Sequence, residues 1–220
     1  MRNPWGDDTE WKGEWGDSSK MWNERRKREA YDRMRSHTGS IDEIGKADGI
    51  FWISYNDFFM NFNNLYLCRF FDKEYTEAFF EDEWSKAKAT AGGCTNNDSV
   101  GFNPQMKLYV DAAGDAPVDV YMQLNVQGVS SQTKDLSIGF ELYDLEGRKV
   151  TSRRNPQPIY SNDDGYKQGI SVTLDGHLKG TDGQPLTLLI TTFEPNKEAK
   201  FRFTIHYKAA QGKVRLEKFT

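Results

Sequence analysis

The residues able to carry catalytic chemistry in this chain are few and scattered. There are two cysteines, Cys68 and Cys94, and three histidines, His37, His177 and His206. A cysteine nucleophile needs a thiolate, an imidazole beside it and a group that orients the imidazole. The cysteines have neither CxxC spacing nor accompanying histidines, which also argues against a zinc site. Residue chemistry alone therefore predicts that these 220 residues are not an enzyme by themselves.

Other catalytic motifs are missing as well. The stretch "TAGGCTNN" (90–97) lacks the Lys-Ser/Thr pair of a phosphate-binding loop, and no GxSxG nucleophile motif occurs. Cys68 lies in an apolar run, which predicts a buried small side chain. Cys94 follows two glycines, without a basic neighbour that would lower its pKa. The cysteine content favours a reduced chain over a single disulfide, and the histidines are expected at the surface.

Charge and hydropathy exclude two broad classes. The net charge of −4 argues against a nucleic-acid partner, because such proteins are usually clearly basic. No apolar run approaches the length of a transmembrane segment, and the N-terminus has no signal-peptide pattern. The expected location is cytoplasmic.

The first third of the chain predicts helices mixed with short extended pieces. Ser18 or Ser19 is expected to cap a helix that runs to about Arg35, and residues 50–53 suit a buried strand. Ser54 is a candidate N-cap for a second, short helix. That helix would carry Phe58, Phe59 and Phe62.

From about residue 84 the hydrophobic period becomes two, which is typical of β-strands separated by Gly, Pro, Asp or Asn turns. About eight strands are expected: 85–93, 104–112, 117–127, 136–147, 169–178, 186–194, 199–209 and 213–219. In the segment 199–209, Phe201, Phe203, Ile205 and Tyr207 should face the core. Strands at this spacing without intervening helices predict an antiparallel β-sandwich.

The order of motifs along the chain resembles the calpain family of papain-like, calcium-dependent cysteine endopeptidases. "RNPWGDDTEWKGEWGDSSKMW" (2–22) and "DGIFWISYNDFFMNFNNLYLCRF" (48–70) are similar to the end of the family's protease core. "AGGCTNN" (91–97), "SIGFELYDL" (137–145) and "TTFEPNKEAKFRFTIHY" (191–207) are similar to its β-sandwich. The resemblance implies an α+β part of protease subdomain 2 at 1–74, an acidic linker at 75–84, and a C2-like β-sandwich at 85–220.

The resemblance also implies site residues. Asn3 of "RNPWG" would be the Asn of a Cys–His–Asn triad, where a neutral amide accepts the second N–H of the imidazole and fixes its tautomer. Trp5 would pack over that hydrogen bond. The family's Gly-x-Cys-Trp and Gly-His-Ala contexts do not occur in this sequence. We therefore expect that these residues include neither the nucleophilic cysteine nor the catalytic histidine. Without the resemblance, Asn3-Pro4 would suggest a simple turn.

A calcium site is implied in the same way. Glu10, Asp17, Asp48 and the backbone carbonyl of Lys46 match family ligands, and oxygen ligands of this kind suit Ca²⁺. Ile50 stands where the family has a further acidic ligand, and the loop before Glu10 is one residue longer than usual. The alternative is that these acidic residues are exposed loop positions.

For the sandwich, the resemblance implies a packing platform for the protease core. The segments 111–119 and 128–135, which carry charge in well-known calpains, have few charges here, so only weak phospholipid contact is expected. No EF-hand loop follows. The leading hypothesis is an incomplete calpain whose partners are protein substrates bound through the catalytic half. The alternatives are a non-catalytic regulatory protein that binds calcium, lipid or a protein, and a bare lipid-binding module.

Overall fold

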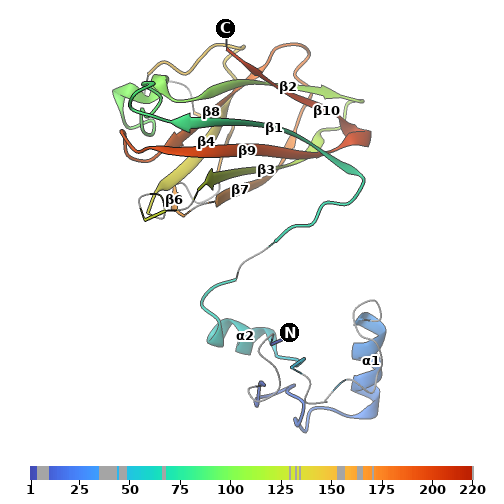
Figure 1. The fold of residues 1–220 in the computed structure, drawn as a ribbon. Helices are drawn as coiled ribbons and strands as arrows, with labels where there is room; N and C mark the ends of the chain where they lie inside the picture. The colour runs from blue at the N-terminus through green and yellow to red at the C-terminus, as the bar shows by residue number, and fades with distance from the viewer. Residues whose placement is uncertain are drawn as a thin grey trace. The chain divides into compact units, whose positions relative to one another are not determined.

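The computed structural model describes residues 1–3, 10–34, 44, 49–65, 68–128, 130–131, 133, 135–152, 157–162, 166–169 and 171–219. The chain divides into two compact units, Met1–Arg69 and Phe70–Thr220 (Figure 1). The first contains two short helices and the second is built of antiparallel strands in two sheets. Neither helix among the described residues has the length and apolar character that a bilayer crossing needs.

Helix α1 of the first unit spans Glu24–Met34, so it begins later than the predicted cap at Ser18 or Ser19. The Ser19 hydroxyl instead accepts the N–H groups of Trp15 and Met21, which closes a turn before the helix. The cap is supplied by Asn23, whose side-chain oxygen accepts the Arg26 N–H at 3.0 Å. An Asn side chain satisfies a free N–H at a helix start as well as Ser does. The helix therefore begins after Asn23 and not after the predicted Ser18 or Ser19.

Helix α2 spans Tyr55–Asn61, and its predicted N-cap is confirmed. The Ser54 hydroxyl accepts the Asp57 N–H at 3.1 Å and donates to the Asp57 carboxylate at 2.7 Å. The buried strand expected at 50–53 does not form. Ile50 makes an isolated bridge with Arg2 and is exposed.

The second unit is an antiparallel β-sandwich, as predicted. Its strands are β1 (Tyr75–Trp84), β2 (Gln105–Ala112), β3 (Val118–Gln127), β4 (Ser137–Tyr143), β5 (Tyr160–Ser161), β6 (Lys167–Gln168), β7 (Ser171–Leu178), β8 (Leu186–Thr192), β9 (Ala199–Lys208) and β10 (Gly212–Lys218). One sheet has the order β1-β9-β3-β7. The other has the order β10-β2-β8-β4-β5, with β6 also paired to β4. Two 3₁₀ helices, η2 (Asp98–Phe102) and η3 (Ala209–Gln211), complete the unit.

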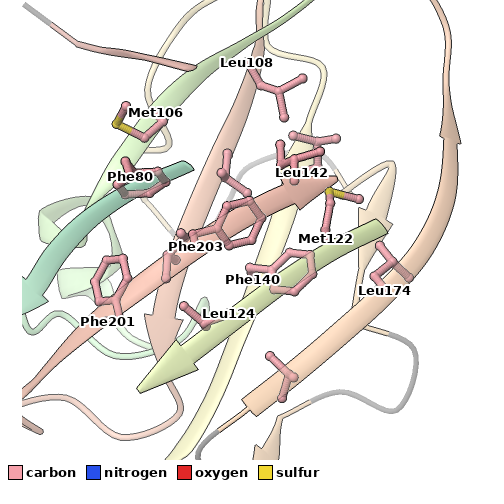
Figure 2. Packing of buried hydrophobic residues seen from close by; sticks show 14 of the residues in the cluster. Phe80, Met106, Leu108, Met122, Leu124, Phe140, Leu142, Leu174, Phe201 and Phe203 are labelled. Atoms are coloured by element: carbon pink, nitrogen blue, oxygen red, sulfur yellow. The ribbon is translucent and has the colours of Figure 1, made fainter. Parts of the chain in front are cut away.

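The core lies between the two sheets and follows from the two-residue period of the strands (Figure 2). In β9 the predicted inward side chains are buried: Phe201, Phe203, Ile205 and Tyr207. Phe140 of β4 meets Phe203 edge to face, with ring centroids 5.0 Å apart. Each fully buried large apolar side chain stabilises the fold by roughly 1.5–3 kcal/mol, so this interface holds the sandwich together.

Strand β1 occupies the segment that the sequence suggested was an acidic linker. It pairs with β9 in register from Tyr75↔Lys208 to Trp84↔Ala199. Trp84 is buried, and its indole N–H donates to the Ile190 carbonyl in the other sheet at 3.2 Å. Of the acidic residues that suggested a linker, Glu77 and Glu81 are exposed on the outward face, as on any strand with one buried face, whereas Asp82 and Glu83 are half-buried.

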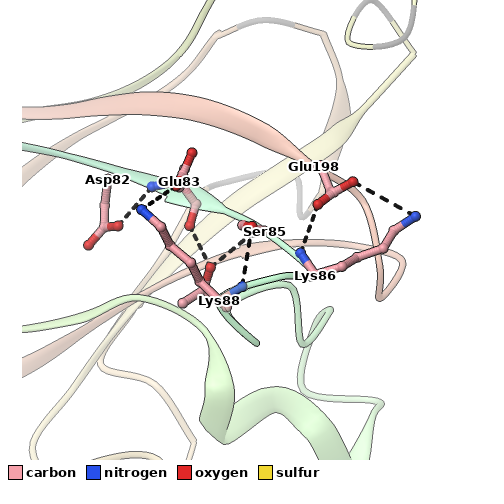
Figure 3. Close-up of polar contacts among 7 residues, drawn as sticks. Asp82, Glu83, Ser85, Lys86, Lys88 and Glu198 are labelled. Carbon is pink, nitrogen blue, oxygen red and sulfur yellow. Dashed lines mark hydrogen bonds and ion pairs between the residues drawn. The ribbon is translucent and has the colours of Figure 1, made fainter.

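The strand expected at 85–93 is a turn that ends β1 (Figure 3). The Ser85 N–H donates to the Thr90 hydroxyl at 2.9 Å, and that hydroxyl donates to the Glu83 carbonyl at 2.7 Å. Lys88 forms an ion pair with Glu83 at 2.5 Å. Side-chain hydroxyls satisfy the backbone here, so the segment needs no partner strand.

Candidate functional site

The first three residues are held by backbone hydrogen bonds to residues 49–51. The Asn3 N–H donates to the Gly49 carbonyl at 2.7 Å, and the Phe51 N–H donates to the Met1 carbonyl at 2.9 Å. Asn3 is half-buried. The predicted triad residue is therefore fixed by its backbone against the segment that follows Asp48. Trp5, predicted to pack over it, lies outside the described residues.

The predicted calcium ligands are described only in part. The Glu10 carboxylate accepts a hydrogen bond from the Gly49 N–H. Both carboxylate oxygens of Asp17 are shielded from solvent. Lys46 and Asp48 lie outside the described residues. Within the described part of the chain, no three His, Cys, Asp or Glu side chains form a metal-binding cluster.

The donor chemistry of the residues present fits a hard cation. Carboxylate oxygens and a backbone carbonyl are the ligands that Ca²⁺ takes in proteins. Glu10 accepts the N–H of Gly49, the residue that follows Asp48 in the sequence, and the Asp17 carboxylate oxygens are shielded from solvent. Ile50 adds no side-chain oxygen, so water or backbone would have to complete the shell.

The two cysteines have opposite environments. Cys94 is buried, and the Asn97 side-chain amide lies 3.7 Å from its sulfur. Cys68 is exposed, so the prediction of a buried side chain is wrong. Leu65 and Phe70, which lie near it in the sequence, are exposed too. Both thiols are free.

The described histidines contact carboxylates and aromatic rings. His177 is exposed and its Nδ1 lies 2.7 Å from Asp119 Oδ1, across the β3–β7 pair. The ring of His206 stacks on Phe71 with centroids 3.9 Å apart. Sequence reasoning missed the Asp119–His177 pair because only strand register brings the two residues together; His37 lies outside the described residues.

The family models match both units of the chain. Residues 1–69 match the model described as "Calpain family cysteine protease", and residues 80–206 match "Calpain large subunit, domain III". The segment that carries Asn3 thus corresponds to cysteine protease sequence, and the β-sandwich corresponds to domain III.

Individual relatives agree with the models. The chain is 31% identical to calpain-type cysteine protease DEK1 of Zea mays over 99% of its own length and 10% of that protein. It is 31% identical to calpain-B of Drosophila melanogaster over 91% of its length and 23% of that protein. For the calpain-1 catalytic subunit of Mus musculus the identity is 30%, over 95% of this chain and 32% of the relative.

A segment that matches a cysteine-protease model, followed by a sandwich that matches domain III, identifies the class of this protein as calpain-type cysteine proteases. This protein belongs to the calpain family. It spans between a tenth and a third of the length of the curated relatives named above.

Proposed function

We propose that this chain supplies the catalytic Asn and the β-sandwich platform of a calpain-type cysteine endopeptidase. The observation that supports this most directly is the match of residues 1–69 to the cysteine-protease model, with Asn3 inside the "RNPWG" motif. The hydrogen bond from the Asn3 N–H to the Gly49 carbonyl gives that residue a fixed backbone. A fixed backbone is what an orienting residue needs, because catalysis depends on the direction of the imidazole.

The proposed role of Asn3 is positional. Its side-chain carbonyl would accept the N–H of the catalytic imidazole, which keeps the other ring nitrogen directed at the thiol and supports the thiolate–imidazolium pair. Trp5 would shield that hydrogen bond from water. The thiol and imidazole must come from a polypeptide that carries the Gly-x-Cys-Trp and Gly-His-Ala contexts, because this sequence contains neither.

The isolated 220-residue chain is therefore expected to have no peptidase activity. A fluorogenic peptide assay with calcium and a reducing agent should give the buffer rate, because neither described histidine belongs to a family triad motif. Thiol-dependent turnover that is abolished by Cys68→Ala or Cys94→Ala would contradict this assignment.

We also propose that Ca²⁺ is held by Glu10, Asp17, Asp48 and the Lys46 carbonyl. When bound, the cation would supply a fixed positive charge that gathers these oxygens. Glu10 and Asn3 both bond to the backbone of Gly49, directly after the proposed ligand Asp48. A cation held by Glu10 would therefore lie close in sequence to the backbone that positions Asn3.

Calorimetric titration with Ca²⁺ tests this site. The full chain should bind the ion, and Asp17→Ala and Asp48→Ala should each weaken binding by at least about tenfold, since hard cations depend on the number of charged oxygens. Asp115→Ala, which removes an exposed carboxylate in the other unit, is the matched control and should bind as the wild type does. Equal Ca²⁺ binding by the wild type and the three variants would contradict the proposed site.

A second candidate function is a non-catalytic, calpain-like regulatory protein that binds calcium, lipid or a protein partner. Such a function would need neither of the two catalytic contexts. In either case we place the protein in the cytoplasm, which suits two free thiols, and expect only weak phospholipid contact through the sandwich.

A further inference from the structure

The first unit contains an aromatic cavity that the proposed protease role does not use. It has a volume of about 310 Å³ and lies between α1 and the Trp-rich segment. Its walls include the indoles of Trp15, Trp22 and Trp52, and α1 contributes Arg26 and Arg33. Pockets that bind small ligands or single side chains are of this size or larger, mostly apolar, with a few charged groups.

The three indoles form a continuous set of perpendicular walls. The rings of Trp15 and Trp22 lie 5.2 Å apart between centroids at 80°. Those of Trp22 and Trp52 lie 5.8 Å apart at 76°. The Trp22 indole N–H donates to the carbonyls of Trp15 and Gly16, at 3.2 and 3.1 Å, which fixes the middle wall. An apolar side chain placed here meets ring faces and edges in a geometry that aromatic contacts favour.

Trp15 is held in a strained backbone conformation to make its wall. Its φ is 67°, in the left-handed region that a bulky residue rarely adopts. The Ser19 hydroxyl accepts its N–H at 3.1 Å, and the Trp22 indole binds its carbonyl. Strain of this kind persists where the surrounding structure enforces it, and such positions are concentrated at ligand sites.

The charges at the cavity rim favour an anion. The Arg26 guanidinium lies over the Trp15 ring, 5.4 Å from its centroid, and also donates to the Met21 carbonyl at 2.8 Å. Arg33 follows two turns later on α1 and is exposed. Glu29 also lines the cavity, but its carboxylate lies 3.6 Å from Arg25 Nε on the helix surface. Because a cation already covers one indole, a cationic ligand would be repelled.

We propose that this cavity binds an apolar side chain of an acidic peptide segment. The aromatic or aliphatic side chain enters between the indoles, and the flanking carboxylates meet Arg26 and Arg33. Planar guanidinium groups bind carboxylates through paired hydrogen bonds, so the two arginines select acidic neighbours while the indoles select the apolar anchor. On this basis the first unit recruits an acidic protein partner, whether or not the chain takes part in proteolysis.

The test is calorimetric titration of the full chain with three synthetic peptides at low salt. Acetyl-Glu-Asp-Phe-Asp-Glu-amide should bind with a Kd below about 1 mM and change the tryptophan fluorescence. The analogue with Ala in place of Phe should bind at least about tenfold more weakly, because it lacks the anchor. The basic analogue, with Lys at the four acidic positions, should not bind. Absence of saturable binding by the first peptide, or equal binding by all three, would overturn the proposal.

Variants on α1 separate this site from general charge attraction. Arg33→Glu should weaken binding of the acidic peptide by about tenfold or more, since a repulsive charge then faces the ligand. Arg28→Glu makes the same charge change on the same helix outside the cavity and should alter the Kd by less than about twofold. Glu29→Gln, which removes the carboxylate of the lining, should tighten binding.

An equal loss of affinity for the acidic peptide in Arg33→Glu and Arg28→Glu would overturn the proposed binding site. Because both arginines are exposed on the helix surface, circular dichroism should show the same fold for each variant. The titration measures no peptide hydrolysis, so its failure would leave the proposed protease role as it was.

Discussion

At the scale of single residues, Asp119 shows how the sandwich places polar side chains that the sequence does not relate. Its carboxylate bonds to Gln211 in η3 at 3.1 Å, to Lys208 of β9 at 3.1 Å and to His177 of β7 at 2.7 Å. These contacts, that with Gln211 first, lower the pKa of Asp119 from 3.8 to about 2. The residues come from separate elements, so Asp119 links three strands and η3 at one end of the sheet.

Asp119→Asn should reveal this link as a pH-dependent loss of stability. A carboxyl whose pKa falls on folding stabilises the native state above its unfolded pKa, and this contribution is lost as the pH falls from 3.8 to about 2. The variant should therefore be less stable than the wild type at pH 5, by at most about 1 kcal/mol, because the side chain is 32% exposed. Urea unfolding at pH 5 and pH 2 measures this.

The difference between the two proteins should shrink at pH 2. Asp115→Asn, which changes an exposed carboxyl on a loop, should match the wild type at both pH values. A loss of stability that is the same at pH 5 and pH 2 would contradict the proposed charge interaction.

At the scale of elements, β1 shows that a segment rich in acidic residues can form a strand of the sheet. Its outward positions carry Glu77, Glu81 and Glu83, whereas Phe80 and Trp84 face the core. Arg202 of β9 lies over the outward Phe79 ring, 3.7 Å from its centroid, and pairs with Glu77 at 3.2 Å. As the edge strand of its sheet, β1 is therefore held beside β9 by contacts on both of its faces.

Two aromatic residues on opposite faces of β1 give a matched test of this arrangement. Trp84→Ala should cost about 3–5 kcal/mol of unfolding free energy, because it leaves a cavity between the sheets. It also removes the hydrogen bond to Ile190. Phe79→Ala removes a half-exposed ring and its cation–π contact, and should cost about 1 kcal/mol or less. Chemical denaturation of the sandwich measures both, and equal costs would contradict the inward placement of Trp84.

The sheet strands were largely predictable from the sequence, whereas the segments near residue 84 were not. β9 follows from the alternation of Phe201, Phe203 and Ile205, a pattern that specifies one buried face. β1 interrupts its alternation with Phe79, and its acidic residues suggested a linker. The turn 85–90 contains no Gly or Pro, and its closure depends on hydroxyl bonds of Ser85 and Thr90 that a two-residue period does not reveal.

The candidate site was predictable only as a motif. "RNPWG" identified Asn3 through its resemblance to a family, but the backbone bonds to residue 49 depend on pairing across the chain. The Trp cavity was not predicted either, because the left-handed Trp15 and the turn closed by Ser19 are set by tertiary contacts.

At the scale of the whole molecule, the two units differ in how much of their own surface they bury. Among the described residues of the first unit, the buried hydrophobic side chains are Ile44 and Phe51. Helix α2 has no buried residue, and Tyr55, Phe59 and Met60 are exposed on it. The sandwich by contrast encloses a full core. The exposed side chains of α2 are expected to pack against further polypeptide, as the proposed protease role requires.

The measurement that tests the central claim most directly is the peptidase activity of a chimera. In it, this chain replaces the matching segment of the mouse calpain-1 catalytic subunit, to which it is 30% identical. The chimera should hydrolyse a calpain peptide substrate in a thiol-dependent reaction. Asn3→Ala should then lower kcat by on the order of 100-fold or more, because the imidazole loses its orientation, whereas Asn196→Ala in the sandwich should not. A folded chimera without activity, or an Asn3→Ala chimera as active as its parent, would contradict the account.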